Sequence, residues 1–379
     1  MSNINVVLIN KEKIEKLDEK TKKYVQEETF AVDVRKPEEI KETPKNKLNI
    51  KGGCKNIPFN TSEEGGLKNV AEKIRKEWRE TKKPLVIQCA SGRRALKITR
   101  TIMDLEKLDK NEEKGTIYVH VEKITEEAPT MIQLYDRVSC TYTFIIADEN
   151  TKEAVIVDSV DSQTERDYDY LATFNDYKTI GILETHIHAD HITGSHNLNE
   201  KLKENNKVKG NVVHYASIAA NVVPEERPRF RGVKDLDVIV IGKHYLIVRE
   251  TPGHTDTCVS YITNNLENVM TGDVLFIRGC GRTDFQAGSP KNMFHSIQTI
   301  LYEGLPDETR VYPGHDYKGC LYSTIGHEKK FNPRCPKGQT VEKFTEIMEN
   351  LNLNPPQKLK ESVPGNLELG HIKEEEKKE

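Results

Sequence analysis

Four short polar turns, each directly after an apolar run, constrain this chain more than any other feature. Each turn carries histidine or aspartate, as in Thr185-His186-Ile187-His188-Ala189-Asp190-His191, Pro252-Gly253-His254-Thr255, Thr271-Gly272-Asp273 and Pro313-Gly314-His315. Imidazole and carboxylate groups are the ligands that borderline cations take, and the first turn alone presents several of them. A single His-x-His pair would be a weak signal, but four such turns in order predict a metal site along one rim of the fold.

Length and composition set the remaining bounds. The 379 residues exceed one typical core and predict two domains. Charged residues make up 31% of the chain but the formal net charge is only -3, so no global field favours nucleic acid or an anionic membrane as a partner. No stretch of about 20 apolar residues, signal-peptide core or Arg-rich presequence is present, which predicts a cytoplasmic protein. Seven cysteines without paired spacing indicate free thiols, and residues 373–379 read as a disordered tail.

The first block of the chain alternates strand and helix patterns. Residues 30–35 and 85–88 read as buried strands, and the helix between them has one apolar face with Leu67, Val70, Ala71, Ile74 and Trp78. This alternation predicts a parallel α/β sheet. After Cys89 the pattern becomes helical, so Cys89 opens a loop at a helix N-terminus. Backbone N–H groups there, with Arg93 and Arg94, would stabilise a thiolate, which makes Cys89 a candidate nucleophile. The alternative is a buried core cysteine at a strand end.

Three motifs give this block, about the first 105 residues, its resemblance to a known family. They are Asp33-Val34-Arg35-Lys36-Pro37-Glu38-Glu39, Gly53-Cys54-Lys55-Asn56-Ile57-Pro58 and the loop at 89–94. The block resembles a rhodanese domain, which implies that Cys89 carries sulfur as a persulfide. A phosphatase loop of the same ancestry needs arginine six positions after the cysteine, and Ala95 stands there, which favours sulfur over phosphate. Ala90 and Ile50 stand where rhodaneses usually have arginine and histidine. A non-enzymatic module that binds or senses persulfide therefore stays open.

In the second block, short apolar runs recur between turn signals. They are residues 143–146, 154–157, 180–183, 238–241, 245–248, 259–262 and 311–312. Helical stretches are interspersed, for example the face with Met293, Ile297 and Ile300. Two packed sheets with helices outside would account for this pattern and would gather the histidine and aspartate turns along one rim. We place the domain boundary near residue 118, which gives domains 1–117 and 118–379.

The order of the polar turns gives the second block, from about 130 to 370, its resemblance. It resembles the metallo-β-lactamase superfamily, which implies an αββα sandwich. Two glutathione-linked branches compete: glyoxalase II enzymes hydrolyse a glutathione thioester with two metals, and persulfide dioxygenases oxidise glutathione persulfide with one iron. The stretch Arg278-Gly279-Cys280-Gly281-Arg282-Thr283-Asp284-Phe285-Gln286 looks like the dioxygenase pattern. Further matches are residues 312–319, 332–334, 350–353 and Pro355.

The resemblance implies one Fe(II) per chain, held by His186, His254 and Asp273, with glutathione as co-substrate. Three ligands on one face leave open positions where O2 and a persulfide sulfur bind side by side. The remaining turn residues are expected to orient the ligands or, in a two-metal hydrolase, to hold a second metal: His188, Asp190, His191 and His315. The expected contacts to glutathione carboxylates or its amine are Arg282, Asp284, His315 and Tyr317, with structural salt bridges as the alternative.

The remaining cysteines and one histidine are read as packing residues: Cys140, Cys258, Cys280, Cys320, Cys335 and His196. Glu368 stands where the family is expected to place arginine, which would change the affinity for thiol substrates. The combined hypothesis is that Cys89 accepts or donates a sulfane sulfur while the iron domain converts glutathione persulfide, O2 and water to sulfite and glutathione. Thiosulfate would be either the donor or the product, and that direction stays open. The expected partners are these small molecules, without nucleic acid or membrane, and a homo-oligomer is left open.

Overall fold

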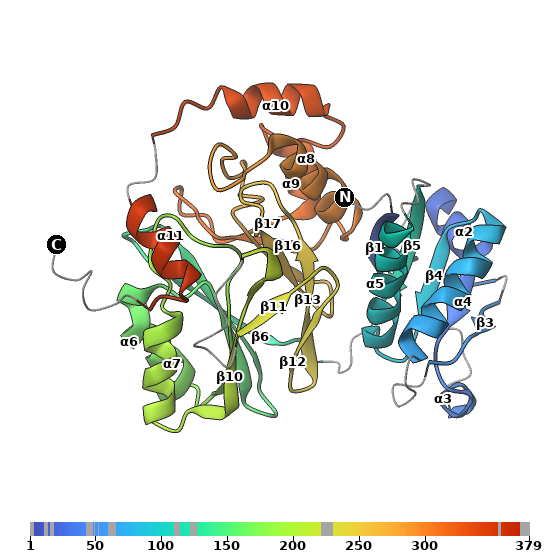
Figure 1. Ribbon diagram of the computed structural model, residues 1–379, viewed down its shortest axis with the longest axis horizontal. Coiled ribbons are helices and arrows are strands. Elements are labelled where there is room, and N and C mark those ends of the chain that lie inside the picture. Colours follow the sequence, from blue (N-terminus) through green and yellow to red (C-terminus); the bar gives the residue numbers. More distant parts are fainter. Residues whose placement is uncertain are drawn as a thin grey trace. The chain divides into compact units, whose positions relative to one another are not determined.

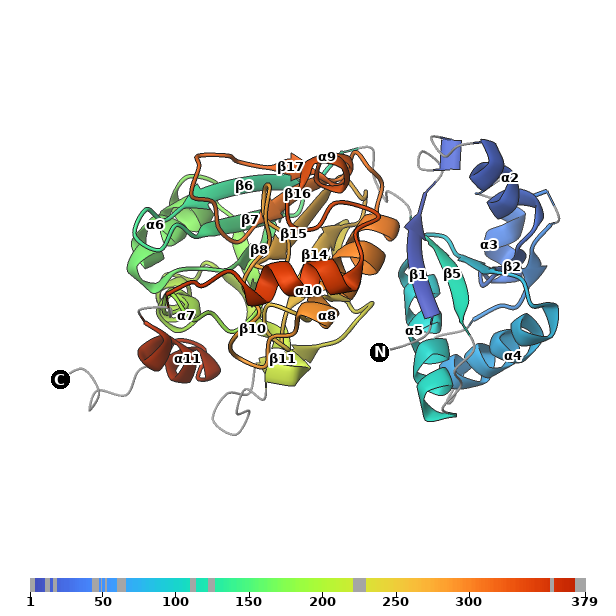
Figure 2. The same ribbon diagram turned by 90° about the horizontal axis from the view of Figure 1, so that it is seen from above.

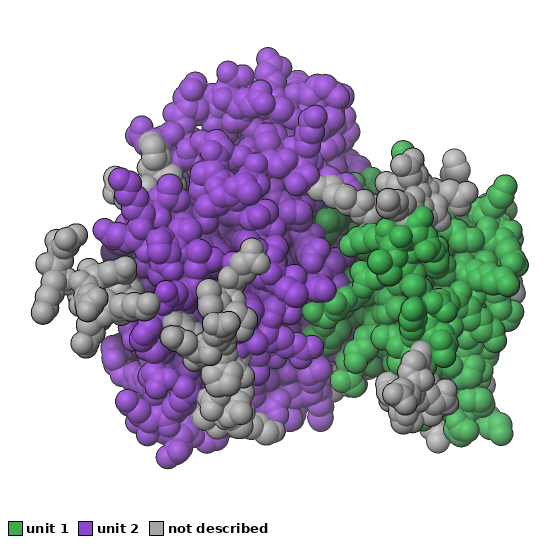
Figure 3. Space-filling model, in the orientation of Figure 1, with its two compact units in different colours: residues 1–124, 236–238, 299–306 green, residues 125–235, 239–298, 307–379 purple. Residues whose placement is uncertain are grey.

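The computed structural model describes residues 4–10, 14–15, 19–42, 48, 50–51, 53–59, 66–109, 114–121, 127–220, 230–354 and 358–371. The chain divides into two compact units (Figure 3). Unit 1 comprises residues 1–124 with 236–238 and 299–306, and unit 2 comprises residues 125–235, 239–298 and 307–379. Pro355 and the predicted tail at 373–379 lie outside the described residues. No helix in the described part is long and apolar enough to cross a membrane.

Unit 1 is built on a five-stranded parallel sheet of order β1-β5-β4-β2-β3. Its strands are β1 Ile4–Ile9, β2 Phe30–Asp33, β3 Lys55–Asn56, β4 Leu85–Gln88 and β5 Gly115–His120. Its helices are α2 Glu19–Glu27, α3 Pro37–Glu42, α4 Gly66–Thr81 and α5 Arg93–Leu108. Figure 2 shows α4 and α5 on one face of the sheet and α2 and α3 on the other. The predicted parallel α/β sheet is confirmed, and the apolar face of α4 is buried through Ala71, Ile74 and Trp78.

Because of strand β5, the first unit ends later than the domain boundary that we placed near residue 118. It lies between β1 and β4 and pairs in parallel with both. The boundary at 117/118 would cut this central strand, whereas the division into compact units falls after Ile124. The strand sequence is short, and the strand with which it pairs most fully, β1, lies at the start of the chain. From the sequence alone, residues 117–121 fit either a last strand or the start of a linker, and the structure shows a strand over most of this stretch.

Unit 2 contains two six-stranded sheets, of order β11-β10-β9-β8-β7-β6 and β12-β13-β14-β15-β16-β17. The first has β6 Thr130–Tyr135, β7 Tyr142–Asp148, β8 Glu153–Val157, β9 Lys178–Leu183, β10 Val208–Ser217 and β11 Phe230–Val233. The second has β12 Val238–Ile241, β13 His244–Glu250, β14 Val259–Thr263, β15 Asn268–Gly272, β16 Arg310–Pro313 and β17 Ser323–Thr324. The sheets share a core that includes Phe144, Val155 and Leu183 from one and Leu246, Val259 and Met270 from the other.

Helices cover the outer faces of this sandwich (Figure 1). They are α6 Thr164–Tyr168, α7 Ser195–Glu204, α8 Pro290–His295, α9 Ile325–Phe331, α10 Val341–Glu349 and α11 Leu359–Leu367. Short helical turns lie at Asp161–Gln163, Asp169–Thr173, Ile218–Ala220 and Ser296–Glu303. Because strand side chains alternate between faces, Ile145 and Ile156 pack outward against Leu198 and Leu202 of α7. The predicted αββα sandwich is therefore confirmed for unit 2.

Strand register explains why the polar turns meet. Strands β8 and β9 run in parallel, so the residues after them, Asp158 and Glu184, lie beside one another. Strands β15 and β16 also run in parallel, which brings Asp273 close to His315. The carboxyl ends of parallel strands share one edge of a sheet, so the fold itself gathers side chains that are far apart in the sequence.

Candidate metal centre

Three buried side chains converge at this rim. His186 follows β9, His254 follows β13 and Asp273 follows β15. One ligand atom from each lies within 4.8 Å of the other two, and all three residues are buried. The Asp273 Oδ2 atom is 3.6 Å from His254 Nε2. Two imidazoles and one carboxylate on a common face are a donor set for a divalent transition metal.

Hydrogen bonds on the far side of each ring turn the other nitrogen toward the site. His254 Nδ1 is 2.8 Å from the carbonyl oxygen of Arg282, to which it donates. His186 Nδ1 is 3.0 Å from the Thr185 hydroxyl, which in turn donates to Asp158 Oδ2 at 2.8 Å. Both rings are thereby held with Nε2 facing the site, the orientation that a metal ligand needs.

A glycine permits the close approach of these two turns. Gly272 has a positive φ of 50°, and a Cβ atom there would lie 2.5 Å from the Thr185 hydroxyl oxygen. A larger residue would therefore displace the hydroxyl that orients His186 as well as straining the backbone. This requirement fits the position of Gly272 directly before the candidate ligand Asp273.

Burial and neighbouring charges prepare the three side chains for a cation. Burial lowers the pKa of His186 well below its usual value and also lowers that of His254. Burial alone would raise the pKa of Asp273, but the charge and hydrogen bond of His315 hold it below its ordinary value. The site thus presents two neutral imidazoles and one carboxylate, the protonation states that metal binding requires.

His315 links two carboxylates rather than pointing at the site. Its Nδ1 atom is 2.7 Å from Asp273 Oδ1, and its Nε2 atom is 2.9 Å from Asp190 Oδ2. Burial alone would lower the pKa of His315, but the charges of Asp273 and then Asp190 raise it well above its usual value. Both ring nitrogens then donate hydrogen bonds, and His191 Nδ1 is also 2.9 Å from Asp190 Oδ2. The chain of contacts fixes one oxygen of Asp273 and leaves the other for the site.

His188 faces a separate acidic pair. Its Nε2 atom is 3.1 Å from Asp158 Oδ1 and 3.4 Å from Glu184 Oε2, and all three residues are buried. Burial alone would lower the pKa of His188, but Asp158 and then Glu184 raise it well above its usual value. His188 Nδ1 and His191 Nε2 are buried without a hydrogen-bond partner. Ligand atoms of His188, Asp190 and His191 also lie within 4.8 Å of one another, so these three residues form a second candidate metal group.

Comparison with known proteins matches this site and fold. The family model of the metallo-β-lactamase superfamily matches residues 135–315. The human persulfide dioxygenase ETHE1 is 36% identical over 244 residues, which cover 64% of this chain and 90% of that protein. The chain belongs to the metallo-β-lactamase superfamily. A crystal structure of ETHE1 from Myxococcus xanthus is 40% identical, with a TM-score of 0.57, and covers 64% of this chain and all of that one. Glyoxylase B2 of Dictyostelium discoideum is 31% identical over 62% of this chain and 88% of its own length.

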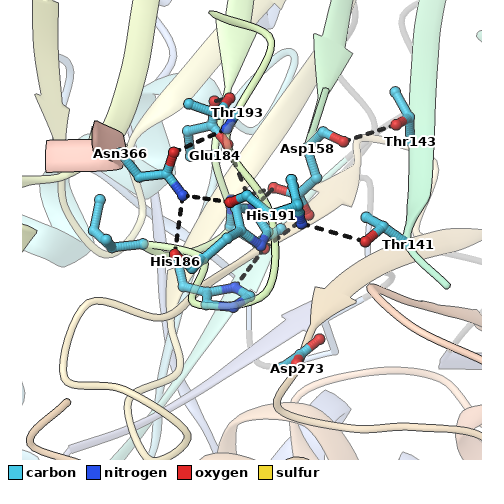
Figure 4. A network of polar contacts seen from close by, with 12 residues as sticks. Thr141, Thr143, Asp158, Glu184, His186, His191, Thr193, Asp273 and Asn366 are labelled. Atoms are coloured by element: carbon cyan, nitrogen blue, oxygen red, sulfur yellow. Dashed lines mark hydrogen bonds and ion pairs between the residues drawn. The ribbon is translucent and has the colours of Figure 1, made fainter. Parts of the chain in front are cut away.

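A residue that sequence analysis missed holds the main ligand turn of the metallo-β-lactamase unit. Asn366 of α11 is buried, and its amide nitrogen donates to the carbonyl oxygens of His188 at 2.9 Å and His191 at 2.8 Å. Its Oδ1 atom accepts from the Thr193 N–H at 2.8 Å. Figure 4 shows Asn366 beside the turn that carries His186 and His191. A lone asparagine near the C-terminus carries no sequence signal for such a clamp.

A cavity of about 520 Å³ opens onto the metal centre. Its wall includes the candidate ligands His254 and Asp273, apolar side chains Phe276, Phe285 and Leu353, and cations Arg282, Lys318 and Arg334. Of the predicted glutathione contacts, Arg282, Tyr317 and His315 line the cavity. Asp284 does not line it and pairs with Arg282 at 2.6 Å. Lys318 and Arg334 were missed, because neither is singled out by a metal-ligand motif.

The predicted loop in unit 1 lies at the start of a helix, and of its two arginines only Arg94 is near the buried Cys89 sulfur. Helix α5 begins at Arg93, and the buried Cys89 sulfur accepts a hydrogen bond from the Gly92 N–H at 3.1 Å. Arg94 forms two hydrogen bonds with Glu39, of 2.8 and 2.5 Å, and is also a hydrogen-bond partner of the Cys89 thiol. The Arg93 side chain is exposed. Cys89 therefore lies in a loop with a backbone donor and one nearby cation.

Proposed function

We propose that the metallo-β-lactamase unit oxidises glutathione persulfide with O2 at a single Fe(II) held by His186, His254 and Asp273. The observation that carries the proposal is the buried face of two imidazoles and one carboxylate at the end of a cavity. The persulfide dioxygenases among its relatives support the same reaction. The balanced reaction converts one persulfide, one O2 and one water to glutathione, sulfite and two protons.

The metal and the chain have distinct tasks in this proposal. Bound Fe(II) would supply the redox chemistry that O2 needs, with open positions beside its three protein ligands. His315 holds Oδ1 of Asp273 at 2.7 Å, which leaves Oδ2 directed to the metal. The Thr185 hydroxyl, fixed by Asp158, keeps the proton of His186 on Nδ1. The apolar side chains Phe276 and Phe285 in the cavity wall would exclude water from the reactive sulfur.

The cations of the cavity suit the two carboxylates of glutathione. Arg282 is already paired with Asp284 and donates to the Asn354 carbonyl oxygen at 2.5 Å, so it is held in position. Arg334 and Lys318 add two positive charges to the same wall. Arginine binds carboxylate with paired hydrogen bonds, which makes Arg334 the strongest candidate, because the guanidinium group of Arg282 is already paired with Asp284. His315 is better suited to fixing Asp273 than to contacting glutathione, because both of its ring nitrogens have carboxylate partners.

The test is O2 uptake by the iron-loaded chain with glutathione persulfide, with sulfite measured in parallel. We expect one sulfite for each O2 consumed. Arg334→Gln should raise KM at least about tenfold, the usual effect of losing a charged hydrogen bond of about 1.5 kcal/mol or more. Arg310→Gln is the matched control, since Arg310 lies exposed on β16 and is not among the residues that line the cavity. Absence of uptake at full iron occupancy would reject the dioxygenase proposal.

A two-metal hydrolase of a glutathione thioester is the second candidate. The unpartnered buried nitrogens of His188 and His191 are the observation that favours it, since a second cation would satisfy them. Against it, Asp158 raises the pKa of His188, so a second cation would have to displace a proton from that ring before it could bind. Two metals per chain together with thioester hydrolysis would establish the hydrolase.

For unit 1 we propose a rhodanese-like role, in which Cys89 carries a sulfane sulfur. Support comes from the Gly92 N–H on its sulfur and from Arg94 beside it. Cys89→Ser should abolish sulfur transfer from thiosulfate to a thiol while leaving O2 uptake with added glutathione persulfide. Cys54→Ser is the control, because burial raises the pKa of Cys54 to about 12, which disfavours its thiolate. Equal loss of both activities in Cys89→Ser would contradict independent sites. Failure to form a persulfide on Cys89 would favour a regulatory module.

A further inference from the structure

Two buried thiols meet in the wall of the metal cavity. Cys280 follows Gly279 in the segment after Asp273, and Cys335 lies 55 positions further along the chain. Both are fully buried. The Cys335 side chain is a hydrogen-bond partner of the Cys280 thiol. Their sequence positions predicted packing roles for both cysteines, and their contact points to a chemical role instead.

The backbone around the pair is fixed by one side chain. Asn332 donates from Nδ2 to the Gly279 carbonyl oxygen at 3.0 Å. Its Oδ1 atom accepts from the N–H groups of Arg334 at 3.0 Å and Cys335 at 3.2 Å. The buried amide of Asn332 therefore ties together the two segments that carry the sulfurs. Thiols held in contact in this way need little backbone movement to be oxidised together.

The surroundings of Cys280 favour a reactive thiolate. Arg334 donates to the Cys280 carbonyl oxygen at 2.7 Å and is also a hydrogen-bond partner of its thiol. The hydrogen bond from Cys335 lowers the pKa of Cys280. Burial acts in the opposite direction, and Arg334 adds to the lowering. Cys258, equally buried in the same unit, has its pKa raised to about 12 by burial. The lowered pKa of Cys280 is therefore not a result of burial. Because the thiolate is the reactive form of cysteine, this lowering favours reaction at Cys280.

One member of the pair, Cys280, also belongs to the wall of the metal cavity. Cys280 and Arg334 line the same cavity as His254 and Asp273. The Met348 thioether, 3.6 Å from the Cys280 sulfur, completes a polarisable environment. A persulfide that enters this cavity toward the metal would therefore pass Cys280, which is next to the guanidinium group of Arg334 and has Cys335 behind it.

We propose that Cys280 and Cys335 form a second sulfur-reactive site, which reduces a low-molecular-weight persulfide to sulfide and becomes a disulfide. The inference rests on the proposed function, in that the cavity must admit a persulfide. The Cys280 thiolate attacks the outer sulfur of glutathione persulfide, forms a Cys280 persulfide and releases glutathione. Cys335 then attacks the inner sulfur of Cys280 and releases hydrosulfide. In total, two protein thiols and one persulfide give one disulfide, one glutathione and one hydrogen sulfide.

The experiment uses the full iron-loaded chain, reduced and then treated with glutathione persulfide in the absence of O2. The dioxygenase reaction cannot proceed under these conditions, because it consumes O2. We expect one sulfide released per chain from this site, and a disulfide between Cys280 and Cys335 in the peptide map. A Cys89→Ser background removes the sulfur carrier proposed in unit 1. Cys335→Ser should stop at the first step, with one added sulfur on Cys280 and no disulfide, whereas Cys280→Ser should give neither product.

Cys320→Ser is the matched control, since Cys320 is a partly exposed free thiol in the same unit. It should form the Cys280–Cys335 disulfide as the parent does. A parent chain that keeps both thiols reduced, or that forms the disulfide only with peroxide, would overturn the inference. O2 uptake by the same preparation tests the proposed function separately. Uptake without the disulfide would reject the dithiol site alone, and the disulfide without uptake would reject the dioxygenase alone.

Discussion

Replacement of Asn366 by alanine should destabilise the metallo-β-lactamase unit through its ligand turn. The change removes three buried hydrogen bonds of 2.8 to 2.9 Å, which leaves the Thr193 N–H and the carbonyl oxygens of His188 and His191 unpaired. At about 1 kcal/mol for each bond, the free energy of unfolding should fall by about 3 kcal/mol. Iron affinity should fall too, because the turn that positions His186 loses its clamp.

Asn366→Asp separates hydrogen bonding from packing in the same experiment. An aspartate has nearly the same shape, but its second oxygen would face the carbonyl oxygens of His188 and His191 and would have no proton to donate. This variant should therefore be less stable than the alanine variant.

Urea unfolding followed by circular dichroism measures the loss in unit 2. Fluorescence of Trp78, the only tryptophan in the chain and a residue of unit 1, serves as the internal control. An alanine variant within about 0.5 kcal/mol of the parent, the usual range of surface substitutions, would refute the reasoning. An aspartate variant as stable as the parent would do so as well.

Two further predictions concern buried carboxylates. Burial raises the pKa of Asp167 to about 6 from 3.8, so the folded state binds the extra proton between these pH values and loses stability as pH rises through them. The free energy of unfolding of Asp167→Asn, measured by urea titration, should therefore rise relative to that of the parent by up to about 3 kcal/mol between pH 4 and pH 7. A difference between variant and parent that does not change with pH would contradict the raised pKa of Asp167. Asp273→Ala should lose iron, measured by elemental analysis, and the control Asp284→Ala should retain it. Full iron content in Asp273→Ala would reject Asp273 as a ligand.

The candidate ligands could be predicted because they belong to short turns of distinctive composition. His186, His254 and Asp273 each follow an apolar strand. Strands β13 and β15 both run antiparallel to β14 between them, so their carboxyl ends share one edge of the second sheet. Residue type and local order were sufficient to find them. The two packed sheets could be predicted for the same reason, since alternation of buried side chains along a strand is a local property.

Other parts of the site depend on contacts between distant segments. Asn366 acts on backbone carbonyl oxygens that are more than 170 positions earlier in the chain, and backbone acceptors leave no pattern in a sequence. The contact between Cys280 and Cys335 is likewise visible only once Asn332 has joined their segments. His315 was expected to orient a ligand, to hold a second metal or to contact glutathione, and the sequence could not decide among these because its two carboxylate partners come from separate loops. The domain boundary was placed inside β5 because the neighbours of β5 in the sheet are not its neighbours in the chain.

The number of metal ions that supports activity tests the central claim most directly. Fe(II) would be titrated without O2 into the metal-free chain, and persulfide-dependent O2 uptake would then be measured at each iron content. The account predicts that uptake rises linearly and reaches its maximum at one iron per chain, held by His186, His254 and Asp273. A maximum reached only at two metals per chain would contradict it and would identify the group around His188, Asp190 and His191 as a second metal site.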